Sequence, residues 1–234
     1  MSLESRLQRF QHLAELSADI RILPLAQREL WSSLSEIPEN FVLYGGTALA
    51  LHLGHRTSVD FDFFAHEPFL PGDLQAHLNW LDIGQIDRSE PNNLAVTTSD
   101  DVHLSFFGNM QLYTVRPPEI TKDNGLVIAS IDDLAGTKLK TILDRSEWKD
   151  YFDIYSILKT DKLTLIEILS YAETIFAPNF SFPFDLALKS LEWFKSGSAP
   201  KLSEEVKDYL KKAVQNTYGQ KIPATKPYRK TIRP

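Results

Sequence analysis

The sequence predicts an α/β (α+β) protein, in which a mixed β-sheet with flanking helices is followed by a lobe made of helices alone. Two observations lead to this prediction. Between residues 41 and 130, short apolar runs with a period of two are separated by turns rich in glycine, proline and aspartate. From residue 131 onward, apolar residues recur at steps of three to four, and proline or glycine marks the breaks. We therefore expect a core with N-terminal helices over 1–130, a helical lobe over 131–220, and a basic extended tail over 221–234.

Helices are expected at the N-terminus, over residues 3–18 and 24–37, because leucines and aromatic residues recur there mostly at helical spacing. Pro24 separates the two. The apolar run 41–44 then predicts a buried strand, and the glycine pair after it predicts a tight turn. A short helix should follow over 47–53, with Thr47 as its cap and Gly54 as its stop.

Residues 59–64 alternate apolar and acidic side chains, which predicts a strand with Val59, Phe61 and Phe63 toward the core. A helix over about 72–81 should come next. Further strands are expected at 85–89, 93–98, 102–107 and 126–130. Helices of the second lobe are expected over about 131–145, 148–159, 163–176, 185–195 and 203–216.

Composition excludes several classes of protein. The 234 residues contain no cysteine, so a disulfide scaffold, a thiol-ligated zinc site and a cysteine nucleophile are all excluded. Residues 1–120 carry seven basic and sixteen acidic side chains, whereas residues 121–234 carry eighteen basic and fifteen acidic ones. An acidic region beside a basic one suits a metal–nucleotide complex, although the same asymmetry also describes ordinary solvated surface.

The ends of the chain lead to two expectations. The first residues lack the pattern of a signal peptide, and no apolar run approaches the roughly 20 residues that span a bilayer, so we expect a cytoplasmic protein without a membrane partner. The tail 221–234 holds five basic residues, no acid and three prolines, so it should be extended, and either disordered or laid on a partner. Its deletion should weaken any affinity for nucleic acid.

Two features of the core carry the chemistry. Gly45 and Gly46 join a strand to a helix, where backbone N–H groups and the helix N-terminus suit a phosphate, although a plain turn explains the pair as well. Asp60 and Asp62 stand two residues apart on a strand, so both carboxylates leave the same face about 6.5–7 Å apart. A hard divalent cation such as Mg²⁺ suits such a pair, whereas a polar strand face is the simpler interpretation.

Together these features resemble a known family. The segment LYGGTALAL at 43–51, followed by HRTSVDFDFF at 55–64, resembles the signature of the polymerase-β-like nucleotidyltransferase superfamily, and within it the AbiEii/AbiGii toxin-type nucleotidyltransferases. A second segment, with Lys138, Lys140, Arg145, Lys149-Asp150 and Asp153, is similar to the C-terminal motif of the same family. The two motifs bracket residues 43 to 153.

The resemblance implies roles for the core residues. Gly45, Gly46 and Thr47 would cradle the nucleotide phosphates, and Ser58 would bond a phosphate oxygen. Asp60 and Asp62 would bind Mg²⁺, with Mn²⁺ as an alternative ion. Arg56 lies beside them and could pair either with Asp62 or with a phosphate; the sequence leaves both open.

It also implies roles for residues of the helical lobe. Lys138 or Lys140 would reach the triphosphate as a point charge, which fits a reaction that relies on charge neutralisation. Asp150 would activate the acceptor, and Asp153 would be structural. The alternative interpretation is that Lys149, Asp150 and Asp153 form an exposed helical face with a local ion pair.

The implied activity is transfer of a nucleoside monophosphate from an NTP to an RNA (tRNA) or protein acceptor, with release of pyrophosphate. The family further implies the toxin of a bacterial toxin–antitoxin or phage-defence system, with an antitoxin partner. One departure favours a competing hypothesis, a catalytically degenerate nucleotide- or nucleic-acid-binding module. A third carboxylate is often present on a neighbouring strand in the superfamily, and here that strand offers Ser105 or His103 instead.

Overall fold

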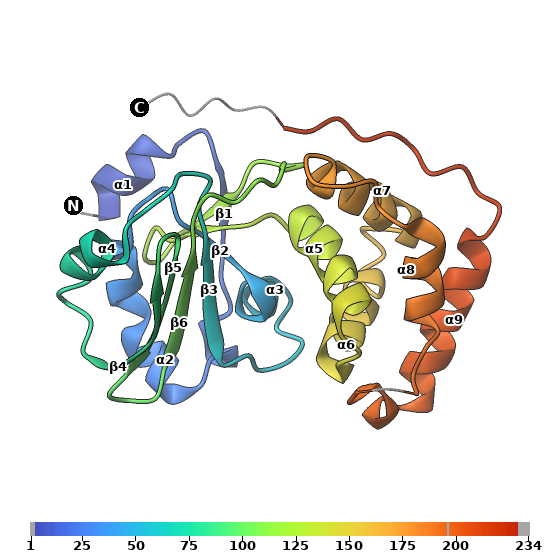
Figure 1. The fold of residues 1–234 in the computed structure, drawn as a ribbon, viewed down its shortest axis with the longest axis horizontal. Helices are drawn as coiled ribbons and strands as arrows, with labels where there is room; N and C mark the ends of the chain where they lie inside the picture. Colours follow the sequence, from blue (N-terminus) through green and yellow to red (C-terminus); the bar gives the residue numbers. More distant parts are fainter. Residues whose placement is uncertain (1–2, 196, 229–234) are drawn as a thin grey trace. The chain divides into compact units, whose positions relative to one another are not determined.

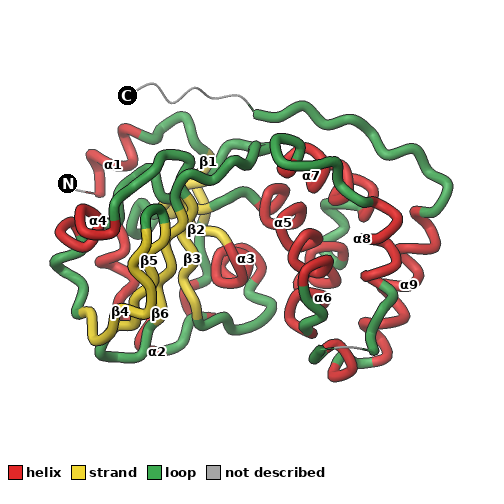
Figure 2. Tube along the Cα trace, viewed as in Figure 1, coloured by secondary structure: helices red, strands yellow, loops and turns green. Residues whose placement is uncertain are grey.

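The computed structural model describes residues 3–195 and 197–228, which form two compact units. The first unit runs to Gln111 and resumes over Pro117–Ser130. The second takes Leu112–Arg116 and everything from Ile131 onward. Figure 2 shows strands in the first unit and helices in the second, as the sequence predicts. None of the helices among the described residues combines the length and the apolar character needed to cross a membrane.

A mixed sheet forms the first unit, and its described strands follow the order β1-β7-β8-β2-β3-β6-β5-β4 (Figure 1). The strands are β1 Ala14–Leu16, β2 Val42–Tyr44, β3 Asp60–Phe64, β4 Ile83–Glu90, β5 Asn93–Thr98, β6 His103–Phe107, β7 Glu119–Thr121 and β8 Val127–Ile128. The central strand β3 is antiparallel to β2 and parallel to β6. This placement gives every residue of β3 a neighbour on β6.

One expectation for the N-terminal region is wrong, and another is refined. Helix α1 (Leu3–Arg9) ends far earlier than residue 18, and the segment after it contains β1, which pairs with β7. The expected helix over 24–37 is an α-helix, α2 (Leu25–Leu30), continued by the 3₁₀ helix η2 (Trp31–Glu36). A further 3₁₀ turn, η1 (Ile20–Ile22), precedes α2.

The apolar face of β3 anchors the core. Phe61 and Phe63 have no exposed surface, and Phe63 stacks on Phe106 of β6 with ring centres 5.1 Å apart. Val59, which the alternation placed in the core, is instead 55% exposed, because β3 begins one residue later. The opposite face of the strand is half-buried and carries Asp60 and Asp62.

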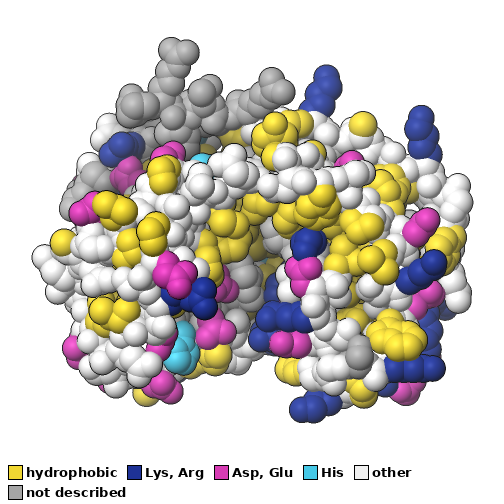
Figure 3. All heavy atoms as spheres, viewed as in Figure 1, with side chains coloured by type: hydrophobic (Ala, Val, Ile, Leu, Met, Phe, Trp, Pro, Cys, Tyr) yellow, Lys and Arg dark blue, Asp and Glu magenta, His cyan; other side chains and the backbone are white. Residues whose placement is uncertain are grey.

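The second unit is built from the helices α5 (Ile131–Asp144), α6 (Trp148–Leu158), α7 (Leu165–Phe176), α8 (Phe184–Leu191) and α9 (Glu204–Thr217), with a 3₁₀ turn η3 (Ala199–Lys201). Helix α5 packs against α6, α7 and α8. Gly136 allows the close approach to α7, since a Cβ there would lie 2.6 Å from Ile175 Cδ1. Figure 3 shows Lys and Arg side chains spread over the visible face of this unit, in keeping with its basic composition.

The described part of the C-terminal tail packs against the second unit. Ser170 Oγ of α7 donates to the carbonyl oxygen of Pro223 at 2.5 Å, and Thr174 Oγ1 donates to that of Thr225 at 3.1 Å. The Tyr228 N–H donates to Thr114 at 2.7 Å. The tail up to residue 228 therefore contacts the second unit itself. Residues 229–234 of the expected tail lie outside the described residues.

Candidate active site

The glycine turn of the first unit lies directly against Asp62. Helix α3 (Gly45–Leu53) begins at Gly45, which has φ of +75°, so a side chain there is disfavoured by the backbone alone. A Cβ on Gly45 would also collide with the Asp62 carboxylate. Tyr44 is the N-cap, so the helix begins two residues before the expected start, and Thr47 is not its cap. The expected stop at Gly54 is present, in the left-handed conformation.

Gly46 faces two other predicted site residues. A Cβ on Gly46 would lie 2.8 Å from Arg56 Nη2 and 2.8 Å from Ser58 Oγ. Because both residues are glycine, a carboxylate, a guanidinium group and a hydroxyl group can approach the start of α3 closely. The unbonded N–H groups of a helix N-terminus and a guanidinium group both suit phosphate oxygens.

Thr47 has a different place from the one expected. Its side chain is fully buried, and its hydroxyl group donates to the backbone carbonyl oxygen of Asp60. This bond fixes the first turn of α3 to the start of β3. The Thr47 hydroxyl group therefore holds the scaffold beneath the site, and a phosphate contact from this residue would come from its backbone.

Asp60 and Asp62 leave the same half-buried face of β3. Across the sheet, Asp60 is in register with His103 and Asp62 with Ser105, so β6 carries no carboxylate at either position. Within the described chain, no three His, Asp or Glu side chains are arranged to hold a metal ion. A pair of carboxylates nevertheless fits Mg²⁺, which takes one or two protein carboxylates and completes its shell with water and substrate phosphates.

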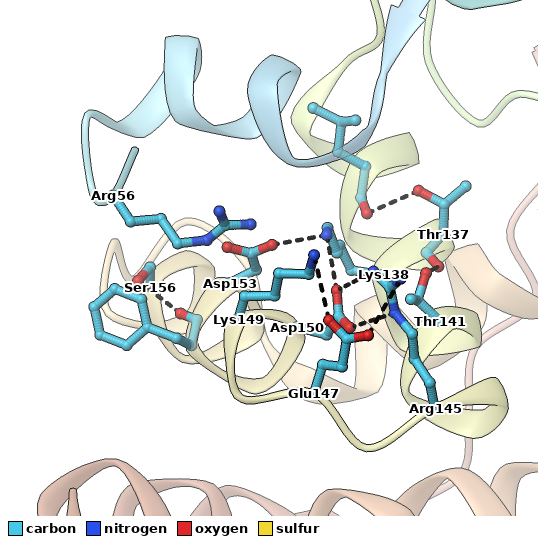
Figure 4. A network of polar contacts seen from close by, with 12 residues as sticks. Arg56, Thr137, Lys138, Thr141, Arg145, Glu147, Lys149, Asp150, Asp153 and Ser156 are labelled. Atoms are coloured by element: carbon cyan, nitrogen blue, oxygen red, sulfur yellow. Dashed lines mark hydrogen bonds and ion pairs between the residues drawn. The ribbon is translucent and has the colours of Figure 1, made fainter. Parts of the chain in front are cut away.

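The predicted residues of the second unit form a buried ion cluster (Figure 4). Lys138 Nζ lies 3.0 Å from Asp150 Oδ1 and 2.8 Å from Asp153 Oδ2, and both aspartate side chains have no exposed surface. Arg145 Nε donates to the other Asp150 oxygen at 2.9 Å. The interpretation of Asp150 and Asp153 as an exposed helical face is therefore wrong. Arg145 belongs to the second sequence motif, but no role in the site was predicted for it. The sequence signal for the cluster is the charge balance of the motif, in which two cations, Lys138 and Arg145, accompany two anions, Asp150 and Asp153.

The two candidate lysines are separated by this geometry. Lys138 is buried in the cluster, whereas Lys140 pairs with Asp144 on the next turn and lies over the Phe180 ring, 5.7 Å from its centre. Asp150 has both carboxylate oxygens engaged by cations. The expected role of Asp150 as a group that activates the acceptor stays a prediction.

The structure thus brings the predicted residues together in two groups, one in each unit. Comparison with known proteins assigns both groups to one family. The model of the family described as "Nucleotidyl transferase AbiEii toxin, Type IV TA system" matches residues 28–92 and 81–226. The chain belongs to the AbiEii nucleotidyltransferase family. The matched range contains both motifs, so the AbiEii resemblance of the sequence is confirmed, and with it the activity class.

Three further proteins are similar to this AbiEii member. An uncharacterised protein of Aquifex aeolicus is 27% identical over 206 residues, which cover 84% of this chain and 98% of that protein. A crystal structure from H. pylori, whose assignment as a nucleotidyltransferase is provisional, has a TM-score of 0.54 at 19% identity and covers 82% of this chain and 93% of its own. MenT4, a nucleotidyltransferase toxin from Mycobacterium tuberculosis H37Rv, has a TM-score of 0.40 at 15% identity, with 82% and 89% covered.

Proposed function

We propose that this AbiEii-type nucleotidyltransferase toxin transfers a nucleoside monophosphate from an NTP to a hydroxyl group of an RNA, with tRNA as the first candidate, or of a protein. The observation that supports the proposal is the contact between the glycine turn and the acidic strand. Glycine at 45 and 46 lets Asp62, Arg56 and Ser58 approach the start of α3 closely, so groups that suit a cation and a phosphate chain are gathered at one place.

The triphosphate is expected to lie at the start of α3. Backbone N–H groups of Gly45 and Gly46 would donate to phosphate oxygens, Ser58 Oγ would donate a further hydrogen bond, and Arg56 would neutralise charge. Asp60 and Asp62 would hold Mg²⁺, or Mn²⁺ in its place. When bound, the ion would supply neutralisation of charge on the phosphate oxygens.

In the reaction, the acceptor hydroxyl oxygen forms a bond to the α-phosphorus, and the bond from that phosphorus to the bridging oxygen breaks. Pyrophosphate leaves, and the hydroxyl proton passes to water. Catalysis of this kind depends mainly on positioning and electrostatic stabilisation, and both are properties of the groups gathered around α3.

For the second unit we propose a positioning role in place of direct chemistry. Lys138, Arg145, Asp150 and Asp153 satisfy one another's charges, so the cluster holds α5 and α6 together. A contact from Lys138 or Lys140 to the triphosphate would have to replace an existing ion pair. The family description also supports an antitoxin as a partner of this chain.

The test is transfer of label from each NTP carrying ³²P at the α-phosphate, with total cell RNA or lysate protein as acceptor. Wild type with Mg²⁺ should label one acceptor class, and Asp60→Asn should lower the rate by at least about 1,000-fold. Asp100→Asn is the matched control, because Asp100 is an exposed carboxylate of the same sheet region.

One observation favours the degenerate binding module, namely that Ser105 stands beside Asp62 where a third carboxylate could be. If wild type binds NTP with Mg²⁺ but transfers no label to either acceptor class, this second function replaces the first. Calorimetric titration with a non-hydrolysable NTP measures the binding separately.

A further inference from the structure

Three side chains on the Asp60 face of the sheet form a hydrogen-bonded chain outside the predicted site. Thr97 Oγ1 lies 2.6 Å from Asp87 Oδ2 and 2.8 Å from His103 Nδ1. Gln85 Nε2 donates to the other Asp87 oxygen at 2.6 Å and so holds the carboxylate. Thr97 is in register with His103, and His103 is in register with Asp60. The chain therefore ends in the strand position next to Asp60.

The number of protons on each group decides which group donates in these hydrogen bonds. A threonine hydroxyl group has one proton, and an ionised carboxylate only accepts, so Thr97 donates to Asp87. Its oxygen must then accept from His103, which places a proton on Nδ1. In the neutral imidazole the lone pair is consequently on Nε2.

The His103 side chain is partly open to solvent. The His103 side chain is 48% exposed, and Asp101 Oδ1 lies 4.0 Å from Nε2, beyond hydrogen-bonding distance. A lone pair held in a fixed tautomer on an open sheet face is suited to accept a hydrogen bond from a ligand.

The side of β3 on which His103 lies matters for the proposed reaction. Helix α3 follows β2 and contacts β3, whereas β6 borders the other edge of β3. In phosphoryl-type transfer the entering and leaving oxygens are roughly in line, on opposite sides of the phosphorus. With the triphosphate at the start of α3, the entering hydroxyl group therefore comes from the β6 side.

We propose that Nε2 of His103 accepts a hydrogen bond from the entering hydroxyl group of the acceptor and orients its oxygen for attack. Asp87 and Thr97 hold the ring in the required tautomer. The inference rests on the proposed function, and it requires only a hydrogen bond from the acceptor hydroxyl group to His103.

Two isosteric variants test it. Asparagine at position 103 keeps a donor near the position of Nδ1, which faces Thr97, but leaves the position of Nε2 empty; glutamine places a polar group at that distal position. His103→Asn should lower kcat/KM for the acceptor by about 10- to 100-fold, the effect of losing one hydrogen bond to a buried or reacting group. His103→Gln should recover a large part of this loss, and KM for the NTP should stay unchanged in both variants.

The control and an independent readout accompany these variants. Asp101→Asn should leave kcat/KM unchanged, because Asp101 is exposed and asparagine tolerates its positive φ. Imidazole ¹⁵N NMR should show the Nδ1–H tautomer of His103 in wild type, and Thr97→Val should change it.

The outcomes separate the two proposals. If wild type transfers label and His103→Asn keeps full kcat/KM for the acceptor, the role of His103 is overturned while the proposed function stands. Equal loss in the Gln and Asn variants, or an Nε2–H tautomer in wild type, also overturns it. If wild type labels no acceptor, the proposed function fails and the inference fails with it.

Discussion

The two units of this chain use the same residue types in opposite ways. In the first unit, Asp60 and Asp62 stand on a half-buried strand face with glycines beside them. In the second, Asp150 and Asp153 have no exposed surface and share the Lys138 ammonium group. Carboxylates left open to solvent can meet a ligand, whereas carboxylates that are buried and paired hold helices together. Exposure and pairing, which the sequence does not reveal, distinguish the two roles.

The contrast between the carboxylates of the two units predicts the largest change in stability at Asp150. Asp150→Asn should lower the free energy of unfolding by about 3 kcal/mol, because Asp150 has no exposed surface and its loss of charge takes one ion-pair partner from the buried Lys138 and one from Arg145. Asp60→Asn should change that free energy by less than about 0.5 kcal/mol, since Asp60 is only half-buried and the substitution removes its repulsion from Asp62. Chemical denaturation of both variants measures the difference.

This pair of variants can also contradict the comparison. An Asp150→Asn variant with wild-type stability and no transferase activity would show that Asp150 acts in the reaction. The second unit would then contribute chemistry directly, and the role proposed for the ion cluster would be wrong.

The glycine turn offers a second test, which depends on backbone strain and steric contact and not on charge. Gly45→Ala should lower the free energy of unfolding by about 1–3 kcal/mol and abolish NTP binding, because φ is positive and the new Cβ meets the Asp62 carboxylate. Gly72→Ala is the matched control: Gly72 lies in α4 (Pro71–His77) with nothing within 4 Å of its Cβ position. It should be neutral or raise stability by about 0.5–1 kcal/mol.

An equal response of Gly45→Ala and Gly72→Ala in thermal denaturation and NTP binding would mean that the turn is not packed as described. If Gly45→Ala loses stability but still binds NTP normally, the turn is a structural element only.

The tail tests how the second unit is stabilised away from its ion cluster. Deletion of residues 219–234 removes the hydrogen bonds that Ser170 and Thr174 donate and the one that Thr114 accepts, so the free energy of unfolding should fall by about 1–3 kcal/mol. A variant with Lys221 and Lys226 both changed to Gln keeps these backbone contacts and should keep that stability. Thermal denaturation of the two variants shows whether the tail stabilises the second unit through its hydrogen bonds or through its charges.

The same two variants decide what the tail does for nucleic acid. If its cations contact phosphates, both variants should bind RNA more weakly and with a smaller dependence on salt. If RNA binding by the two variants depends on salt as strongly as that of wild type, the tail cations do not contact phosphates, and the role of the tail is its packing on α7.

Local patterns predicted much of this fold, and distant pairing accounts for most of the errors. The alternation in residues 60–64 and the glycine at 54 specify β3 and the end of α3 by themselves. Strand β1, in contrast, is only three residues long, and its two exposed residues carry no apolar signal. It exists because it pairs with β7, more than 100 residues away, and no local pattern contains that information.

The site shows the same division. The motif with Gly45, Gly46 and Asp62 is compact in sequence, and the turn that joins these residues in space is predictable from it. The ion-pair partners of Asp150 could not be predicted from the sequence in this way, because its pairing with Lys138 depends on how α5 packs against α6. The chain from Asp87 through Thr97 to His103 crosses three strands, so only the sheet register reveals it.

The smallest expected effect concerns an acid in a third situation, half-buried and hydrogen-bonded at a helix start. Thr164 and Glu167 form a capping box at the start of α7, with Glu167 Oε2 accepting from the Thr164 N–H at 2.8 Å. Thr164→Ala should lower stability by about 1 kcal/mol. The hydrogen bonds from Thr164 lower the pKa of Glu167, so its contribution is present above the ordinary pKa of the group and is lost as pH falls through the lowered value. Thermal denaturation between pH 7 and pH 3 should therefore show a steeper loss for wild type than for Glu167→Gln, and parallel curves would mean that the box adds no pH-dependent stability.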